Sequence, residues 1–142
     1  MLERVQEDLN RALKAGDKQT VSALRMLVSV LKNAQIETQG KLTQEQSYKI
    51  VQKEIKKRIE ARDLYQQHDR VEQAAAEEFE RQILAQYAPT MLNEQDIDKL
   101  ITEQSASIEN PNFSSLMPLV MKAAAGRADG KIVADRVKVF LS

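Results

Sequence analysis

The sequence predicts an all-α protein: an N-terminal helical part with a long helical hairpin, followed by a small C-terminal three-helix bundle. Three observations predict this fold. Apolar residues recur at intervals of three and four along nearly the whole chain, which is the helical period. No stretch of convincing length alternates between apolar and polar residues as a strand would. Gly, Pro and capping residues interrupt the helical pattern at intervals, and they predict where helices begin and end.

The first two helices form the beginning of the N-terminal part. Val5, Leu9 and Ala12 mark the first helix, which Gly16 ends. Asp17 is expected to cap the second helix, and Gly40 to end it. The apolar face of this second helix consists of Val21, Leu24, Leu27, Val28, Leu31 and Ala34. Its opposite side includes Arg25, Ser29 and Lys32 on one face, which we interpret as an ordinary solvated edge.

A long helical hairpin follows. Thr43 and Gln46 match a capping box, so a helix is expected from there to about residue 67, with a length of roughly 35 Å. The pattern breaks at His68-Asp69, then resumes until Pro89. Residues 41–68 hold seven cations and four anions, whereas residues 69–88 hold two cations and five anions. We therefore expect an antiparallel pair of helices with charges facing each other, where each exposed ion pair adds only about 0–1 kcal/mol.

Three shorter helices are expected after Pro89. Asn93 is placed to cap the first of them, and Ser114 or Ser115 to cap the second, with Pro118 tolerated in the first turn or so. The turn chemistry of residues 110–113 predicts a loop between these helices. The expected division is an N-terminal helical part over residues 1–89 and a C-terminal helical bundle over residues 90–142. At 142 residues the chain can bury one modest core or two small ones.

The corner between the last two helices is built around Gly126 and Asp129. Gly126 is expected to end one helix, because glycine enters the left-handed conformation without a Cβ penalty. Asp129 is expected to cap the next helix through its carboxylate. A helix N-terminus flanked by Arg127 and Lys131 could also receive a phosphate oxygen. Asp129 occupies the same donors and repels a phosphate, so the structural cap is favoured, and the two cations stay available beside it.

The composition argues against catalysis, metal binding and a cofactor. Cysteine is absent and His68 is the only histidine, so zinc or iron sites of the usual ligand types cannot be assembled. No Gly-rich phosphate loop is present, and Ser114-Ser115 lacks the surroundings of a nucleophile. We therefore expect no catalytic residue, no metal and no cofactor. No secretory signal or membrane span is visible, and we expect a cytoplasmic protein without a membrane partner.

Charge is sorted along the C-terminal part even though the whole chain is neutral. Residues 89–113 carry one cation and five anions, and residues 114–142 carry five cations and two anions. The last two helices are thus expected to present a basic face that contacts phosphate groups. The candidate residues for tRNA binding are Lys122, Arg127, Lys131, Arg136 and Lys138.

Several short segments, in this order and spacing, together resemble the GatB/YqeY family. They are Leu24-Arg25-Met26-Leu27, Leu31-Lys32-Asn33-Ala34-Gln35-Ile36-Glu37, Gln52-Lys53-Glu54, Tyr87-Ala88-Pro89 and Gly126-Arg127-Ala128-Asp129-Gly130-Lys131. The chain resembles a free-standing YqeY-like protein, which is similar to the C-terminal tail of GatB, a subunit of the tRNA-dependent amidotransferases. The resemblance covers nearly the whole length.

The resemblance implies an all-α fold of two parts and a tail that holds tRNA outside its acceptor end. The family label is amidotransferase-related, a carbon–nitrogen ligase with glutamine as amido donor, but the resemblance implies no catalytic residue in this chain. The implied function is a non-catalytic tRNA-binding accessory module for amidation of Glu-tRNA or Asp-tRNA. Its implied partners are tRNA and an amidotransferase or aminoacyl-tRNA synthetase-type protein. The alternative is a helical protein–protein adaptor without an RNA role, whose long hairpin docks the partner.

Overall fold

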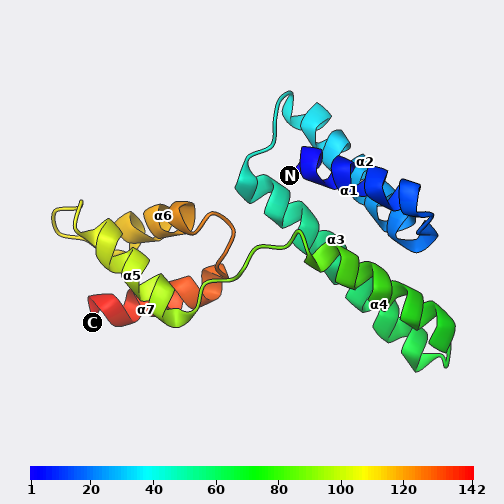
Figure 1. Cartoon of the computed structure of the whole chain (residues 1–142). Helices are drawn as coiled ribbons and strands as arrows, with labels where there is room; N and C mark the ends of the chain where they lie inside the picture. The colour runs from blue at the N-terminus through cyan, green and yellow to red at the C-terminus, as the bar shows by residue number, and fades with distance from the viewer. The chain divides into compact units, whose positions relative to one another are not determined.

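The computed structural model describes all of residues 1–142, and every regular element in it is an α-helix (Figure 1). The all-α prediction is therefore confirmed. The helices are α1 (Leu2–Ala15), α2 (Lys18–Thr38), α3 (Gln44–Gln67), α4 (Val71–Ala85), α5 (Glu94–Ser105), α6 (Phe113–Ala124) and α7 (Gly130–Leu141). They fall into two compact units, Met1–Ala88 and Pro89–Ser142, which are described separately below.

In the first unit, α2 packs against α1, α3 and α4. The side chains of Leu24, Leu27 and Leu31 on its inner face are at most 1% exposed. They are packed with Val5 from α1 and Val51 from α3, among other residues. Burying a leucine side chain fully is worth about 1.5–3 kcal/mol. The apolar face read from the sequence therefore lies in the core, and the opposite face of α2 is left to solvent.

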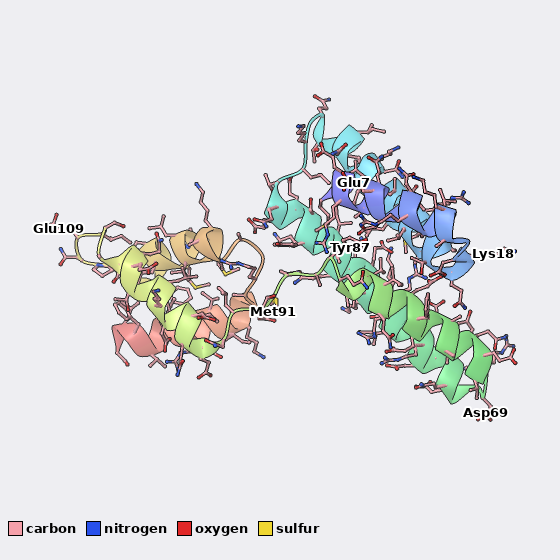
Figure 2. All side chains as sticks on the ribbon, viewed as in Figure 1. Glu7, Lys18, Asp69, Tyr87, Met91 and Glu109 are labelled. Carbon is pink, nitrogen blue, oxygen red and sulfur yellow. The ribbon has the colours of Figure 1, made fainter.

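The hairpin of α3 and α4 is held by charge pairs as well as by apolar contact. Arg58 on α3 lies 3.3 Å from a carboxylate oxygen of Glu77 and 3.4 Å from one of Glu80, both on α4. Arg62 pairs with Glu78 at 2.5 Å. Hydrogen bonds from Arg81 and then Arg62 lower the pKa of Glu78 to about 2. Figure 2 shows Asp69 at the turn of the hairpin, where its backbone takes a positive φ of 57°.

The end of the first unit is fixed by Tyr87. Its ring is 2% exposed, and its hydroxyl donates to the carboxylate of Asp8 on α1. The guanidinium of Arg4 lies 4.9 Å from the ring centroid and donates to the carbonyl of Gln86 at 3.3 Å. Burial raises the pKa of the Tyr87 hydroxyl. Residues 86–88 form turns beyond α4, so α4 ends before the residue predicted from Pro89.

The second unit has a separate core. Ile97 and Ile101 from α5 are at most 1% exposed, and Leu116 and Val120 from α6 are fully buried. Val133 and Val137 of α7 complete this cluster. Asn93 caps α5 in a capping box with Asp96, as expected. The six side chains come from all three helices, so each helix of this unit is anchored by its apolar face.

The beginning of α6 differs from the prediction. Asn112 is the capping residue, and Ser115 is its partner in a capping box; Ser114 and Ser115 are already helical. Pro118 is consequently the sixth residue of the helix rather than a residue of its first turn. Its ring nitrogen carries no hydrogen, so the carbonyl of Ser114 loses the helical donor. Pro118 and Ser114 are both exposed, so water can bind the carbonyl of Ser114.

The corner between α6 and α7 contains two left-handed residues, whereas the sequence predicted only Gly126. Ala125, with φ of 51°, is the left-handed residue that ends α6, and Gly126 follows with φ of 82°. Asp129 is the N-cap of α7, and its carboxylate accepts from the backbone N–H of Lys131 at 2.7 Å. The backbone N–H of Leu92 donates to the carbonyl of Arg127 at 2.8 Å. The corner is thus tied to the segment that precedes α5.

The connectors are expected to be the first sites of proteolysis. Thr90 and Met91 are exposed outside any helix, and Met91 is labelled in Figure 2. Asn110 is likewise exposed, with φ of 54°. Limited proteolysis followed by mass spectrometry should cut at residues 89–93 or 107–112 before it cuts inside α3, because helical backbone must open locally first. Rapid cleavage within residues 44–67, with both connectors intact, would contradict the architecture.

Replacing Ala125 by glycine should stabilise the protein. A non-glycine residue in the left-handed conformation costs roughly 1–2 kcal/mol, and glycine carries no such penalty. Ala125→Gly is therefore expected to raise the free energy of unfolding by about 1 kcal/mol, measured by denaturant titration. The matched control is Ala123→Gly inside α6, which should lower the free energy by about as much. Destabilisation by both substitutions would show that Ala125 is not in the left-handed conformation.

Candidate nucleic-acid interface

The five cations predicted to contact tRNA all lie on or between α6 and α7. Lys122 is in the last turn of α6, Arg127 is in the corner, and the other three are on α7. The side chains of Lys122, Lys131 and Lys138 are exposed, whereas Arg127 and Arg136 are half-buried. The two arginines are in different surroundings from the three lysines.

Arg136 is held by an acidic partner within the unit. Its Nε and Nη2 donate to the two carboxylate oxygens of Asp98 on α5, at 2.8 and 2.6 Å. This paired geometry is the stronger form of an arginine–carboxylate contact. It lowers the pKa of Asp98 and raises that of Arg136. Arg136 therefore connects α7 to α5, and a phosphate would have to compete with Asp98 for its guanidinium.

Arg127 is part of the corner rather than a free side chain. Its Nε donates to the carbonyl of Ala124 at 3.2 Å, close to the end of α6. Its own carbonyl accepts from Leu92. The sequence predicted that this side chain stays available to a phosphate, but it is half-buried. The carbonyl of Ala124 accepts from both the backbone N–H and the Nε of Arg127, at 3.0 and 3.2 Å.

Lys131 and Lys138 share the outer face of α7. They are seven residues apart, which is about two helical turns or 10.5 Å. Neither forms an ion pair, and the ammonium group of Lys138 lies 5.9 Å from the ring centroid of Phe113. Asp135 is exposed and lies between the two lysines by helical spacing. These lysines are free to meet a phosphate, but a carboxylate lies on the same face.

The N-terminus of α7 is already occupied. The carboxylate of Asp129 accepts from Lys131 N–H, so an incoming phosphate would meet a negative charge at close range. A phosphate is therefore better placed beside the corner, near the side chain of Lys131, than at the helix terminus.

Catalytic geometry is not apparent elsewhere in the chain. His68 is exposed at the hairpin turn, and no three His, Cys, Asp or Glu side chains are grouped so as to hold a metal ion. A hollow of about 410 Å³ is lined by Arg4, Tyr48 and Tyr87, among other residues. There, the hydroxyl of Tyr48 accepts from Gln44 and that of Tyr87 donates to Asp8. No helix of the protein has the length and apolar character needed to span a bilayer.

The outer face of α2 carries more polar residues than the sequence predicted. Arg25, Ser29 and Lys32 were expected to form one solvated edge. The structure shows that Lys18 and Ser22 are exposed as well and belong to the same face by helical spacing. The signal in the sequence is a cation every seven residues on the side opposite the apolar positions, and it could have been found by the same count that identified the apolar face.

Comparison with known proteins places the chain in a family. A family model described as Yqey-like protein matches residues 2–141. The chain is also 25% identical over 144 residues to the altered inheritance of mitochondria protein 41, mitochondrial, of Pyrenophora tritici-repentis, and the match covers 97% of this chain and 79% of that protein. Since the family model spans the helices of both units, the chain belongs to the family of YqeY-like proteins.

Proposed function

We propose that this protein is a non-catalytic RNA-binding accessory module whose second unit contacts the phosphate groups of tRNA. The observation that carries the proposal is the set of exposed lysines without ion-pair partners on α6 and α7. Lys122, Lys131 and Lys138 are all of this kind. Lysine side chains in that state neutralise phosphates and release counterions, which is the main source of sequence-independent affinity for nucleic acid.

The expected mode of binding is weak, tolerant of sequence and dependent on salt. Phosphate contacts position a nucleic acid but carry no base information. The protein has few aromatic side chains, so stacking of unpaired bases contributes little. We expect Arg127 and Arg136 to contribute less to RNA affinity than the three lysines, because both guanidinium groups already donate to acceptors within the unit.

The link to amidation of Glu-tRNA or Asp-tRNA is the finer part of this proposal. It is supported by the resemblance of YqeY-like proteins to the C-terminal tail of GatB. In this reading the protein acts beside an amidotransferase or an aminoacyl-tRNA synthetase-type protein in the cytoplasm, and it supplies affinity for tRNA while its partner supplies the chemistry.

A second candidate function is a protein–protein adaptor. It is favoured by the hairpin end, where Leu64 is 55% and Val71 is 74% exposed. The two residues lie on either side of the hairpin turn, on α3 and α4, and exposed apolar surface marks a candidate interaction site. Under this alternative, substituting both residues by serine abolishes partner capture, and the protein shows no salt-dependent affinity for tRNA.

Charge reversal on the outer face of α7 should weaken tRNA binding. We expect Lys131→Glu with Lys138→Glu to lower affinity about tenfold at low salt, because two phosphate contacts are lost. The slope of log affinity against log salt should become shallower by about 2. The measurement is fluorescence anisotropy of the full-length protein with labelled unfractionated tRNA across a salt series.

The matched control for this experiment is Lys53→Glu with Lys56→Glu. Both lysines are exposed on α3 and have no ion-pair partner, so the net charge changes by the same amount at another place. The control should bind within about twofold of the unmodified protein. Equal binding by the α7 variant and the unmodified protein would contradict the proposed contact and favour the adaptor.

Releasing Arg136 from its partner should strengthen tRNA binding. In Asp98→Asn the guanidinium loses one of its two acceptor oxygens and the negative charge that holds it. The side chain at position 98 then competes less with a phosphate, so the salt slope should steepen by about 1. Glu103→Gln removes the same charge from α5 at an exposed residue without an ion-pair partner, and it should leave the slope unchanged. Identical slopes in both variants would show that Arg136 does not reach the RNA even when it is free.

A further inference from the structure

The outer face of α2 carries cations and hydroxyls in a regular row. Lys18, Arg25 and Lys32 follow one another at intervals of seven residues, and Ser22 and Ser29 stand between them at the same interval. All five side chains are exposed. Positions separated by three and four residues share one helix face, so the row covers about 21 Å of helix length from Lys18 to Lys32. We refer to these five residues as the α2 row.

The cations of the α2 row are not neutralised within the protein. None of the three forms an ion pair, although ten such pairs are present. The nearest carboxylate along the chain, that of Asp17, is engaged with the N–H and hydroxyl of Thr20 at 3.2 and 2.6 Å. Ile36, four residues after Lys32, continues the face of the row. The carboxylate of the next residue, Glu37, is about 100° around the helix from that face. The row therefore has no acid on its own face, unlike the face of α7 that contains Asp135.

One end of the row opens into a hollow of about 420 Å³ at the corner between α1 and α2 (Figure 2 marks this end at Lys18). Its lining includes Lys18, Ser22 and Arg25 together with the apolar side chains of Leu13 and Val21. The two cations and the hydroxyl in this lining can donate to phosphate oxygens, and its apolar side chains can contact a sugar or a base of the same nucleic acid.

The chemistry of the row points to a polyanion rather than to a protein helix or a membrane. A protein partner needs an apolar centre to its interface, but the exposed apolar side chains beside the row, Leu13 and Ile36, lie at its two ends and not at its centre. Insertion into a lipid surface needs an exposed apolar helix face, but the apolar face of α2 is buried in the core of the first unit. Repeated cations separated by hydroxyl donors match the repeated phosphates of a nucleic-acid backbone.

We infer that the α2 row is a second contact surface for the phosphate backbone of RNA, in addition to the lysines of the second unit. This inference rests on the proposed RNA-binding function and extends it to the first unit. Arg25 and Lys32 supply the central and far phosphate contacts, and Lys18 with Ser22 supplies those at the hollow. Each surface is expected to contribute its own salt-dependent term to the affinity for RNA.

The test compares two double variants of the full-length protein that change net charge equally. Arg25→Glu with Lys32→Glu alters the row, and Lys53→Glu with Lys56→Glu alters exposed, unpaired lysines on α3. Binding is measured by anisotropy with labelled unfractionated tRNA and by co-sedimentation with phosphatidylserine vesicles. The α2 variant should lose about tenfold in tRNA affinity and about 2 in salt slope, and the α3 variant should change by less than about twofold.

Three outcomes would overturn the inference: unchanged tRNA binding by the α2 variant, an equal loss in the α3 variant, or a loss confined to vesicle binding. Arg25→Gln with Lys32→Gln, a milder change that keeps helix-forming residues, should show a smaller loss in the same direction. Its circular dichroism melt checks that the fold is intact. If Lys131→Glu with Lys138→Glu weakens binding while the α2 variant does not, the inference fails and the proposed function stands. If the unmodified protein does not bind tRNA, both fail.

Discussion

The two-sided character of α2 is the constraint on which the first unit depends. Its leucines at positions 24, 27 and 31 are buried against the other three helices, and a turn of the helix by one residue would carry them about 100° out of the core. The direction of every other side chain on α2 is thereby fixed. The packing that buries the leucines also aligns the cations of the α2 row and exposes them to solvent. The stability of the first unit and its charged surface therefore depend on the same helix orientation.

Cations in this protein have two different uses, and the distinction determines which of them can meet a phosphate. Arg58 and Arg62 join the helices of the hairpin, and Arg136 joins α7 to α5 through Asp98. Arginine suits these positions because its planar group pairs with carboxylates in a fixed geometry. The exposed lysines of α6 and α7 and the cations of the α2 row have no such partner. A formal net charge of zero thus describes the sum over the chain and gives no measure of the field at these faces.

The helix types and most of their ends follow from the sequence, because capping residues and apolar periodicity act over a few neighbouring positions. Asp17, Thr43 and Asn93 cap the helices for which they were predicted. The start of α6 was misplaced because Ser114 and Ser115 are capping residues by type, while Asn112 takes that role through its reciprocal bonds with Ser115. The pairing of Arg136 with Asp98 could not be predicted, since it joins residues 38 positions apart that come together only when α5 and α7 pack. The α2 row was visible in the sequence but was interpreted as a solvated edge, because exposed lysines are common. What distinguishes the row is the repeat of unpaired cations and hydroxyls every seven residues along one helix face.

We propose that RNA phosphates meet the free cations of α2 and of α6–α7, while the hairpin end remains apart from the RNA. Backbone amide chemical shifts of the ¹⁵N-labelled full-length protein, recorded during titration with unlabelled tRNA, test this proposal residue by residue. We expect shifts or line broadening to concentrate on residues 18–36 and 119–138, to diminish as salt is added, and to leave residues 60–75 unchanged. Perturbation concentrated at the hairpin end, around Leu64 and Val71, with α2 and α7 unaffected, would contradict it.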